Sequence, residues 1–260
     1  MIIAQISDTH LLANGSDADA RDRRLGNFER TVAHIRGLAP QPDVVLHTGD
    51  ISQNATGQEY GLAREILSGL KSPVLAIVGN RDRRAPFAAA FAGDGYLRSG
   101  AGFVQYAVAL NGLRLVAADT IDEATPMGGF CDDRLAELDA MLCEAPDMPT
   151  LLFLHHPPKA IPAVPKPHQF EPDEATRLRA LIGRHEQIVR VLCGHTHRAD
   201  QVDVGRVPLS TVPSIATDLR KDRYPDALAD TPVYQLHEVG EDGTVVSRTC
   251  TVSASREDDE

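Results

Sequence analysis

The sequence has no apolar run that approaches the length of a membrane span. Its most apolar segments, such as Val74–Val78 and Leu151–Leu154, are far shorter than the roughly 20 residues that a helix needs to cross a bilayer. No basic segment opens the chain either, because Met1 leads directly into the apolar run Ile2–Ile6. We therefore expect neither a membrane anchor nor a cleavable signal peptide, and we predict a cytoplasmic protein.

Cysteine and positive charge are also scarce. The four cysteines form no CxxC pair, and we expect them to be reduced residues of the core. Lys and Arg number 26 against 37 Asp and Glu, which gives a formal net charge of −11. Long nucleic acids and anionic membranes need a positive surface, so both are poor partners for this chain. A small phosphate ester could still bind to such an acidic chain, because bound metal ions would supply local positive charge.

The rest of the composition is that of a globular protein. The chain has 260 residues, 42% of them hydrophobic and 24% charged, which excludes intrinsic disorder. No linker or internal repeat interrupts the sequence. We expect one domain over residues 1–252, followed by an acidic and flexible tail at residues 253–260.

Short apolar runs alternate with amphipathic segments. The expected strands are Ile2–Ile6, Asp43–His47, Pro73–Val78, Leu113–Ala118, Thr150–Leu154 and Ile188–Cys193. The expected helices are Arg24–Leu38, Gln58–Leu70, Asp132–Cys143 and Glu174–Gly183. This alternation predicts an α/β protein whose sheet is covered on both faces.

The last fifth of the chain has a different pattern. It contains mostly strand-like segments, at Gln201–Val204, Arg206–Thr211, Val233–Glu238 and Thr244–Val252. We expect these to form a second, more antiparallel sheet. Two segments without periodicity, His156–Pro172 and Ser214–Thr231, are expected to be functional loops, because ordered loops of this length are otherwise uncommon.

Residues that can bind metals follow five of the expected strands. They are Asp8 and His10, then Asp50, then Asn80, then His155 and His156, and finally His195 and His197. The carboxyl ends of strands in an α/β sheet line the crevice where ligands bind, so we expect these side chains to converge. Glycines precede Asp50, Asn80 and His195, and they allow the chain to turn tightly there.

The kinds of residue indicate which metals the site prefers. Carboxylate, amide and imidazole ligands suit divalent Zn, Mn, Fe or Co. Seven such residues, counting only one of the neighbouring His155 and His156, exceed what one tetrahedral zinc uses, but they fit two ions if one carboxylate bridges them. An aspartate suits the bridge because its side chain has two oxygens.

With these motifs in place, the sequence resembles the calcineurin-like metallophosphoesterases. Within that family it is similar to the bacterial branch of class III cyclic nucleotide and glycerophosphodiester phosphodiesterases. The resemblance covers Ile2 to about Thr217 and includes Ile51–Asn54 followed by Glu59 and Tyr60. The Asp-Arg-Gly of protein serine/threonine phosphatases is missing. The resemblance implies a four-layer α/β/β/α sandwich of two mixed sheets flanked by helices.

The resemblance also implies a ligand set for two ions. By position, Asp8, His10 and His197 would hold one ion, Asn80, His155 and His195 would hold the other, and Asp50 would bridge them. His155 is preferred over His156 because it directly ends its strand. His156 would then support the site or face the substrate.

One position departs from the family pattern. The family usually has Gly-Asn-His-Asp or Gly-Asn-His-Glu, whereas this chain has Arg81 in place of the histidine. Arginine stays protonated, so it cannot donate a proton to a leaving group, but it can bind a phosphate oxygen. We expect Asn80, Arg81 and His195 to act in catalysis, and Asn80, Arg81 and His156 to contact the substrate. The alternative is that Arg81 pairs with Asp82 or another acid.

The sequence thus predicts a dimetal phosphodiesterase that hydrolyses a small diester, either a cyclic nucleotide or a glycerophosphodiester. Two close ions lower the pKa of bound water, so a bridging hydroxide would attack phosphorus in line with the leaving oxygen. A phosphomonoesterase of the same fold is the alternative. A non-catalytic scaffold is less favoured because all seven ligand positions are filled, and a nuclease is disfavoured by the acidic charge. Self-association through the C-terminal strands is also expected.

Overall fold

The computed structural model describes residues 1–14, 17–97, 102–161, 169–221 and 224–252. Most of its strands belong to two large sheets. The first sheet has the order β13-β12-β1-β2-β3. Its members are β1 (Ile2–Ile6), β2 (Val44–His47), β3 (Val74–Ala76), β12 (Val233–Val239) and β13 (Val245–Thr251). Strands β1, β2 and β3 are parallel, whereas β12 and β13 are antiparallel to their neighbours, so the sheet is mixed.

The second sheet is also mixed and has the order β10-β11-β9-β8-β5-β4. Its members are β4 (Tyr106–Leu110), β5 (Leu113–Ala118), β8 (Thr150–Leu154), β9 (Ile188–Cys193), β10 (Gln201–Val204) and β11 (Val207–Thr211). Its four inner strands are parallel, and the two edge strands run antiparallel to them. A small hairpin of β6 (Ile121–Asp122) and β7 (Thr125–Gly128) follows β5.

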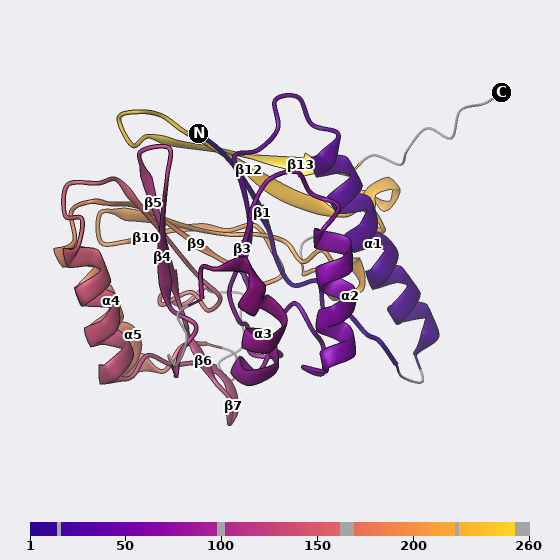
Figure 1. Ribbon diagram of the computed structural model, residues 1–260, viewed down its shortest axis with the longest axis horizontal. Helices are drawn as coiled ribbons and strands as arrows, with labels where there is room; N and C mark the ends of the chain where they lie inside the picture. The colour runs from indigo at the N-terminus through magenta and orange to yellow at the C-terminus, as the bar shows by residue number, and fades with distance from the viewer. Residues whose placement is uncertain (15–16, 98–101, 162–168, 222–223, 253–260) are drawn as a thin grey trace.

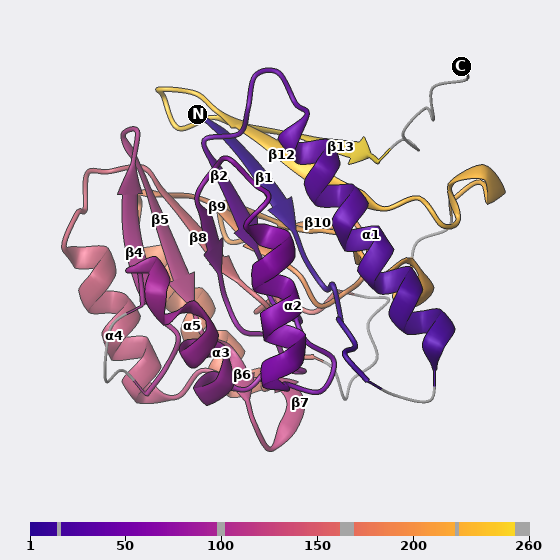
Figure 2. The ribbon, with the colours of Figure 1, turned by 45° about the vertical axis from the view of Figure 1, so that its right-hand side comes forward.

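Helices cover the outer face of each sheet. In Figures 1 and 2, α1 and α2 lie beside the first sheet, and α4 and α5 lie on the far side of the second. The helices are α1 (Ala18–Arg36), α2 (Gly57–Leu67), α3 (Arg84–Phe91), α4 (Asp132–Cys143) and α5 (Pro172–Arg184), with short turns η1 (Ala92–Asp94), η3 (Thr217–Leu219) and η4 (Asp226–Leu228). The four layers, helix, sheet, sheet and helix, confirm the predicted fold class.

Buried apolar side chains hold these layers together in two clusters. The larger cluster contains residues of both sheets and of α1 to α3, including the buried rings of Phe28, Tyr60 and Tyr106. The smaller cluster lies between the second sheet and α4 and α5, around Phe130 and Leu178. Both sheets are therefore packed on both faces, as the continuous burial of β2, β5 and β8 requires.

Strand register brings the ends of the parallel strands to one edge. Ile6 of β1 is opposite His47 of β2, and His47 is opposite Ala76 of β3. In the second sheet, Leu154 of β8 is opposite Cys193 of β9. Within each sheet the loops that follow these strands therefore start at the same level. Nε2 of Gln5 in β1 donates to the carbonyl of Cys193 in β9 at 3.1 Å, and this contact brings the strand ends of the two sheets together.

One sequence-based expectation about the sheets is wrong. The C-terminal strands do not form a sheet of their own, because β10 and β11 extend the second sheet whereas β12 and β13 extend the first. Helix α3, strand β4 and the β6–β7 hairpin were not predicted. Helix α1 begins earlier than expected, at Ala18, because its polar first turn is capped by Asp17, whose side chain accepts from the N–H of Ala20.

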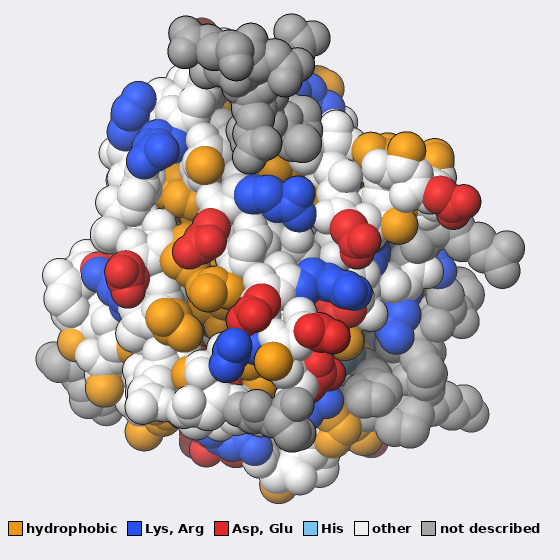
Figure 3. Space-filling view, turned by 90° about the vertical axis from the view of Figure 1, so that its right-hand side faces the viewer, with side chains coloured by type: hydrophobic (Ala, Val, Ile, Leu, Met, Phe, Trp, Pro, Cys, Tyr) orange, Lys and Arg blue, Asp and Glu red, His pale blue; other side chains and the backbone are white. Residues whose placement is uncertain are grey.

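The surface in Figure 3 is the face on which α1 and α2 lie in Figure 1, and its acidic and basic side chains are interspersed. Within the described ranges, no helix combines the length and the apolarity that crossing a bilayer requires.

Candidate metal centre

Five of the seven expected ligand residues have a backbone conformation that side chains disfavour. Their φ angles are positive, at 55° for Asp8, 46° for His10, 52° for Asp50, 68° for His195 and 55° for His197. Left-handed backbone costs a non-glycine residue roughly 1–2 kcal/mol. Strained residues of this kind cluster at functional sites. Here the left-handed backbone directs all five side chains toward the same site.

Close backbone contacts explain two of the glycines in these loops. A Cβ on Gly79 would collide with the backbone N and Oδ1 of Asp50, and a Cβ on Gly194 would collide with Oγ of Ser7. The loops can approach this closely only because positions 79 and 194 lack a Cβ, as the sequence predicted for these glycines.

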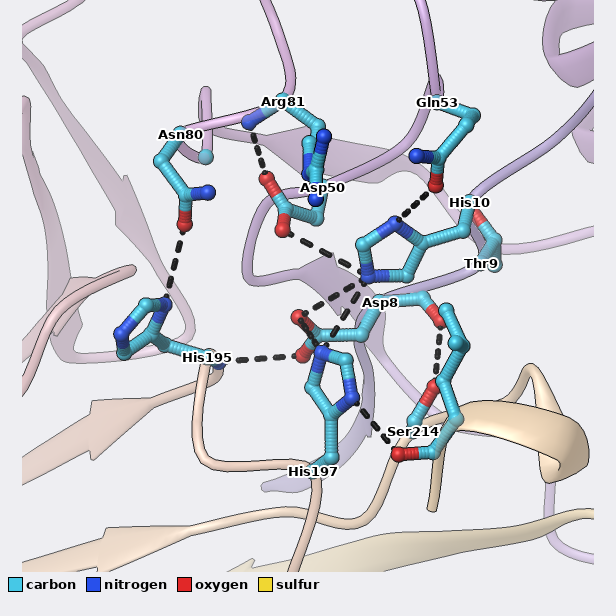
Figure 4. Close-up of polar contacts among 12 residues, drawn as sticks. Asp8, Thr9, His10, Asp50, Gln53, Asn80, Arg81, His195, His197 and Ser214 are labelled. Atoms are coloured by element: carbon cyan, nitrogen blue, oxygen red, sulfur yellow. Dashed lines mark hydrogen bonds and ion pairs between the residues drawn. The ribbon is translucent and has the colours of Figure 1, made fainter. Parts of the chain in front are cut away.

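The first ligand group consists of Asp8, His10 and His197 (Figure 4). The Nε2 atoms of the two histidines lie 3.2 Å apart, and they are 3.7 Å (His10) and 3.2 Å (His197) from Oδ1 of Asp8. All three side chains are buried or nearly so, and Asp8 is fully inaccessible to solvent.

The second ligand group consists of Asn80, His155 and His195. Oδ1 of Asn80 is 3.2 Å from Nε2 of His155 and 3.0 Å from Nδ1 of His195. Asp50 lies between the two groups, because its Oδ2 is 3.5 Å from Nε2 of His10 and 3.6 Å from Nε2 of His155. The structure therefore brings all seven expected residues together.

The other oxygen of Asp50 accepts a hydrogen bond from the backbone N–H of Arg81 at 2.7 Å. Only Oδ2 thus faces both groups. A carboxylate oxygen has two lone pairs, so this one atom suffices for a bridge, and the two free oxygens assumed from the sequence are not needed.

Hydrogen bonding shows which ring nitrogens are available to a metal. Nδ1 of His10 donates to Oε1 of Gln53, that of His197 to the carbonyl of Leu219, and that of His155 to the carbonyl of Thr48. Each neutral ring carries one hydrogen, so the three Nε2 atoms present lone pairs to each other and to carboxylate oxygens.

Facing lone pairs repel each other unless a cation lies between them. Oδ1 of Asp8 is buried and accepts no hydrogen bond, which leaves a charged atom without the partner that burial normally demands. These donors therefore fit divalent metal ions. Without a metal, a proton on His197 can take the place of the cation, because the effect of burial on the pKa of His197 is outweighed by Asp8, which raises it. The pKa of Asp8 then lies well below its usual value, since the opposing effect of burial is outweighed by the charge of His197 and by hydrogen bonds from His10 and His197.

His156 lies beside the second group but is otherwise engaged. Its ring centroid is 4.4 Å from that of His195, its Nδ1 faces Oγ1 of Thr120 at 2.9 Å, and its Nε2 donates to the carbonyl of Pro126 at 3.2 Å. Burial and the neighbouring histidines lower its pKa, so the ring is neutral. This geometry favours a supporting role for His156 over direct contact with substrate, and the preference for His155 as ligand agrees with it.

The side chain of Arg81 is exposed at the edge of the centre. It does not pair with Asp82, whose oxygens instead accept from the backbone N–H groups of Gly79, Ile51 and Ser52 and from the hydroxyl of Tyr60. Burial, and secondarily the charge of Asp50, raise the pKa of Asp82. Asp82 therefore ties the loops after β2 and β3 together, and Arg81 is left facing solvent.

Sequence reasoning missed some residues that orient the ligands. Gln53 stands within the motif that carried the family resemblance, but its contact with His10 was not foreseen. Arg24 and Asp218, which pair beside Gln53, carried no sequence signal.

In Ser214–Thr231, one of the two segments expected to be functional loops, a basic side chain serves the loop itself. Within the described ranges, Arg220 binds the carbonyls of Leu228, Ala229 and Thr231 and lies over the ring of Tyr224, so it holds its own loop together. Residues 162–168 of the other expected loop, His168 among them, lie outside the described residues.

Known proteins resemble this chain over most of its length. The family model described as calcineurin-like phosphoesterase matches residues 1–199. A probable glycerophosphodiester phosphodiesterase, GpdQ of Arcobacter nitrofigilis, is 30% identical over 253 residues, which cover 96% of this chain and 92% of that protein. The 3',5'-cyclic adenosine monophosphate phosphodiesterase CpdA of Escherichia coli K12 is 25% identical over 257 residues, 98% of this chain and 90% of that protein.

A solved structure shares the fold. The dimetal phosphatase from Danio rerio superposes with a TM-score of 0.68 at 15% identity, covering 97% of this chain and 99% of that one. At this identity the likeness speaks for the fold alone. The family model matches residues 1–199, which is most of the chain, and the Arcobacter relative is 30% identical over 96% of it. The chain therefore belongs to the calcineurin-like phosphoesterase family.

Proposed function

We propose that the protein is a metal-dependent phosphodiesterase that hydrolyses a small diester, a glycerophosphodiester or a cyclic nucleotide. The first and second ligand groups would each hold one divalent ion, and Asp50 would bridge them. The observation that carries this proposal is the position of Oδ2 of Asp50, 3.5 Å from Nε2 of His10 and 3.6 Å from Nε2 of His155. One carboxylate oxygen is thereby shared between the two groups.

Charge explains how an acidic chain can attract a phosphate ester. Asp8 and Asp50 contribute two negative charges, whereas Asn80 and the neutral imidazoles contribute none. Two divalent ions exceed these two charges, so the loaded centre is positive in a protein of net charge −11. The acidic net charge supports a small substrate over long nucleic acid, which needs an extended positive surface.

When bound, two divalent ions act as Lewis acids on phosphoryl oxygens and supply a nucleophile from water near neutral pH. The chain itself keeps the histidine Nε2 atoms free of hydrogen through the acceptors at their Nδ1 atoms. Arg81 is exposed at the edge of the centre, where its guanidinium would stabilise charge that develops on the phosphoryl oxygens. Because Arg81 does not lose its proton, it does not serve as general acid.

The choice of a diester rests on the names of the relatives, a probable glycerophosphodiester phosphodiesterase and a cyclic adenosine monophosphate phosphodiesterase. A phosphomonoesterase is the second candidate, because the ligand set determines where the ions bind and not how many ester bonds a substrate has. The metals themselves, Fe, Mn, Zn or Co, stay open among the divalent ions that such ligands accept.

The test combines metal analysis with a substrate panel. Purified protein is expected to contain about two divalent ions per chain and to hydrolyse bis(p-nitrophenyl) phosphate far faster than p-nitrophenyl phosphate. Glycerophosphodiesters and cyclic nucleotides then identify the preferred diester. Faster hydrolysis of the monoester would establish the second candidate, and a lack of metal-dependent turnover of either compound would contradict both.

We also infer that residues 1–252 act as one domain. The expected self-association would use β13, because this strand forms an edge of the first sheet and carries the exposed Val246. Gel filtration with light scattering tests this. The cytoplasmic location stays a prediction.

A further inference from the structure

The side chain of Arg24 in α1 reaches three separate segments around the metal centre. It is 8% exposed, and its Nη1 donates to the carbonyl of His10 and to Oε1 of Gln53, each at 3.3 Å. Its Nε and Nη2 donate to Oδ2 of Asp218 at 3.0 and 2.7 Å. One guanidinium therefore connects the loops after β1 and β2 with the turn η3.

Arg24 determines which atom of Gln53 faces His10. A guanidinium can only donate hydrogen bonds, so the amide oxygen and not the amide nitrogen of Gln53 must point toward it. The same oxygen lies 2.9 Å from Nδ1 of His10 (Figure 4). Nδ1 must therefore carry the ring hydrogen, and Nε2 keeps the lone pair that faces Asp8.

Arg24 acts on His197 through the ion pair with Asp218. Asp218 belongs to η3, and the next residue, Leu219, offers the carbonyl that accepts from Nδ1 of His197 at 2.9 Å. The two-point ion pair fixes η3 against α1 and so holds this carbonyl in place. Arg24 thus orients both histidines of the first ligand group, His10 through Gln53 and His197 through Asp218 and the turn η3.

The second ligand group is oriented by other means. Nδ1 of His155 donates to the carbonyl of Thr48 at 2.8 Å, and His195 lies against Asn80. Among the described residues, no hydrogen bond or ion pair joins Arg24 to this group.

We propose that Arg24 is a positioning residue that sets the metal affinity of the first ligand group while leaving the second group almost unaffected. This inference rests on the proposed metal centre. Outer partners that hold metal-ligating histidines typically change metal affinity about 10–100-fold. Loss of Arg24 is therefore expected to weaken one ion by this factor and to convert a centre with two tightly bound ions into one with a single tightly bound ion.

The experiment titrates the metal-free full chain with Zn²⁺ and follows the assigned histidine ring nitrogen signals by NMR. In the parent, the rings of both groups are expected to respond in the same range of Zn²⁺ concentration. In Arg24→Met and in Asp218→Asn, the signals of His10 and His197 should respond only at about 10–100-fold higher Zn²⁺. The signal of His155 should respond as in the parent.

A matched control is Arg64→Met in α2. Arg64 also forms a short ion pair, with Asp94 at 2.5 Å, and it lies outside the metal centre. This variant is expected to leave both groups unchanged. If it weakened the first group as strongly as Arg24→Met does, a general loss of stability would explain the effect and the proposal would fail.

Variants of Gln53 test the same chain of contacts without altering α1. Gln53→Leu removes the acceptor and should weaken the first group. Gln53→Glu keeps an acceptor for both Arg24 and His10 and should retain parent-like Zn²⁺ binding. If Arg24→Met does not fold, the comparison of Gln53→Leu with Gln53→Glu tests the proposal instead. Equal Zn²⁺ binding by the first ligand group of both Gln53 variants would overturn it.

The results distinguish a failure of the proposed metal centre from a failure of the proposed role of Arg24. A parent protein whose histidines do not respond to Zn²⁺ would remove the proposed metal centre itself. A parent that binds two ions, together with an Arg24→Met variant that binds both equally well, would leave the centre standing and refute the role of Arg24. Equal weakening of both groups in Arg24→Met would refute it as well.

Discussion

The backbone N–H of Arg81 donates a 2.7 Å hydrogen bond to Oδ1 of Asp50, while the Arg81 side chain is exposed. Because this bond uses the main chain, it persists when the side chain of Arg81 is replaced by any residue other than proline. Variants at position 81 therefore test the guanidinium alone, without releasing the carboxylate that lies between the two ligand groups.

Replacement of Arg81 is expected to slow the chemistry and to leave metal binding intact. Loss of an enclosed charge-stabilising donor costs roughly 10²–10³ in kcat, and because Arg81 is exposed we expect a smaller loss of about tenfold for Arg81→Met. The measurement is kcat/KM for bis(p-nitrophenyl) phosphate, together with metal content.

Arg81→His restores the residue usual in the family and adds a group that titrates near neutral pH. We expect its rate to depend on pH in a range where the parent rate is flat. An Arg81→His variant with the activity and pH profile of the parent would show that the guanidinium has no part in the reaction.

Removal of the shared carboxylate should affect both ions at once. We expect Asp50→Ala to lose both metals and the activity, whereas Asn80→Ala should mainly weaken the ion of the second group. Elemental analysis after gel filtration measures both. Asp122→Ala is the control, because Asp122 lies exposed in the β6–β7 hairpin. Parent-like metal content and rate in Asp50→Ala would contradict the assignment.

A methyl group at Gly79 should disturb the centre sterically. Gly79→Ala would place its Cβ against the backbone and carboxylate of Asp50 and 2.8 Å from Cε1 of His155. Overpacking of this kind costs about 1–3 kcal/mol, and here it would also displace two ligands. We expect a lower midpoint in chemical denaturation together with loss of metal.

Gly61→Ala is the matched control for this substitution. Gly61 lies within α2, and nothing would lie within 4 Å of an added Cβ. Alanine is favoured over glycine in a helix by about 0.5–1 kcal/mol, so this variant should be slightly more stable and fully active. A Gly79→Ala variant that behaved like Gly61→Ala would show that the close approach at Gly79 is not required.

A buried histidine of β12 should make the fold sensitive to acid. Nε2 of Gln5 donates to the carbonyl of Cys193, so Oε1 of Gln5 must accept from Nε2 of His237, whose Nδ1 then accepts from the hydroxyl of Ser247. The ring is thus fixed in its neutral form. Burial, aided by the charge of Arg190, lowers the pKa of His237 to about 3.

The sign of the effect follows from the two states of the chain. The unfolded chain takes up a proton at His237 below its usual pKa of 6.5, and the folded protein does not until about pH 3. Stability is therefore unaffected above pH 6.5 and falls as the pH decreases below it, by about 2 kcal/mol at pH 5. Urea unfolding of His237→Gln should show a shallower loss between pH 7 and pH 5 than the parent does. Parallel curves for the two proteins would exclude this role.

The sequence by itself determined the parallel strands and the residues that follow them. Alternating apolar runs and amphipathic segments located β1, β5, β8 and β9 at their observed bounds, and α4 as well. Because parallel strands in register end at one edge, Asp8 and Asp50 could be placed together at one sheet edge, and His155 and His195 at another, from the sequence alone. This inference works because it depends on local pattern and on a general property of sheets.

Only the tertiary structure decided which distant segments support those residues. Arg24 and Asp218 are separated by 194 positions in the chain, and neither stands in a motif that marks it. The sequence likewise did not predict that His156 contacts Thr120 and Pro126, or that the last four strands are divided between two sheets. The physical reason is that such contacts depend on which surfaces become adjacent after the layers pack, and local propensity and hydrophobic period carry no information about that adjacency.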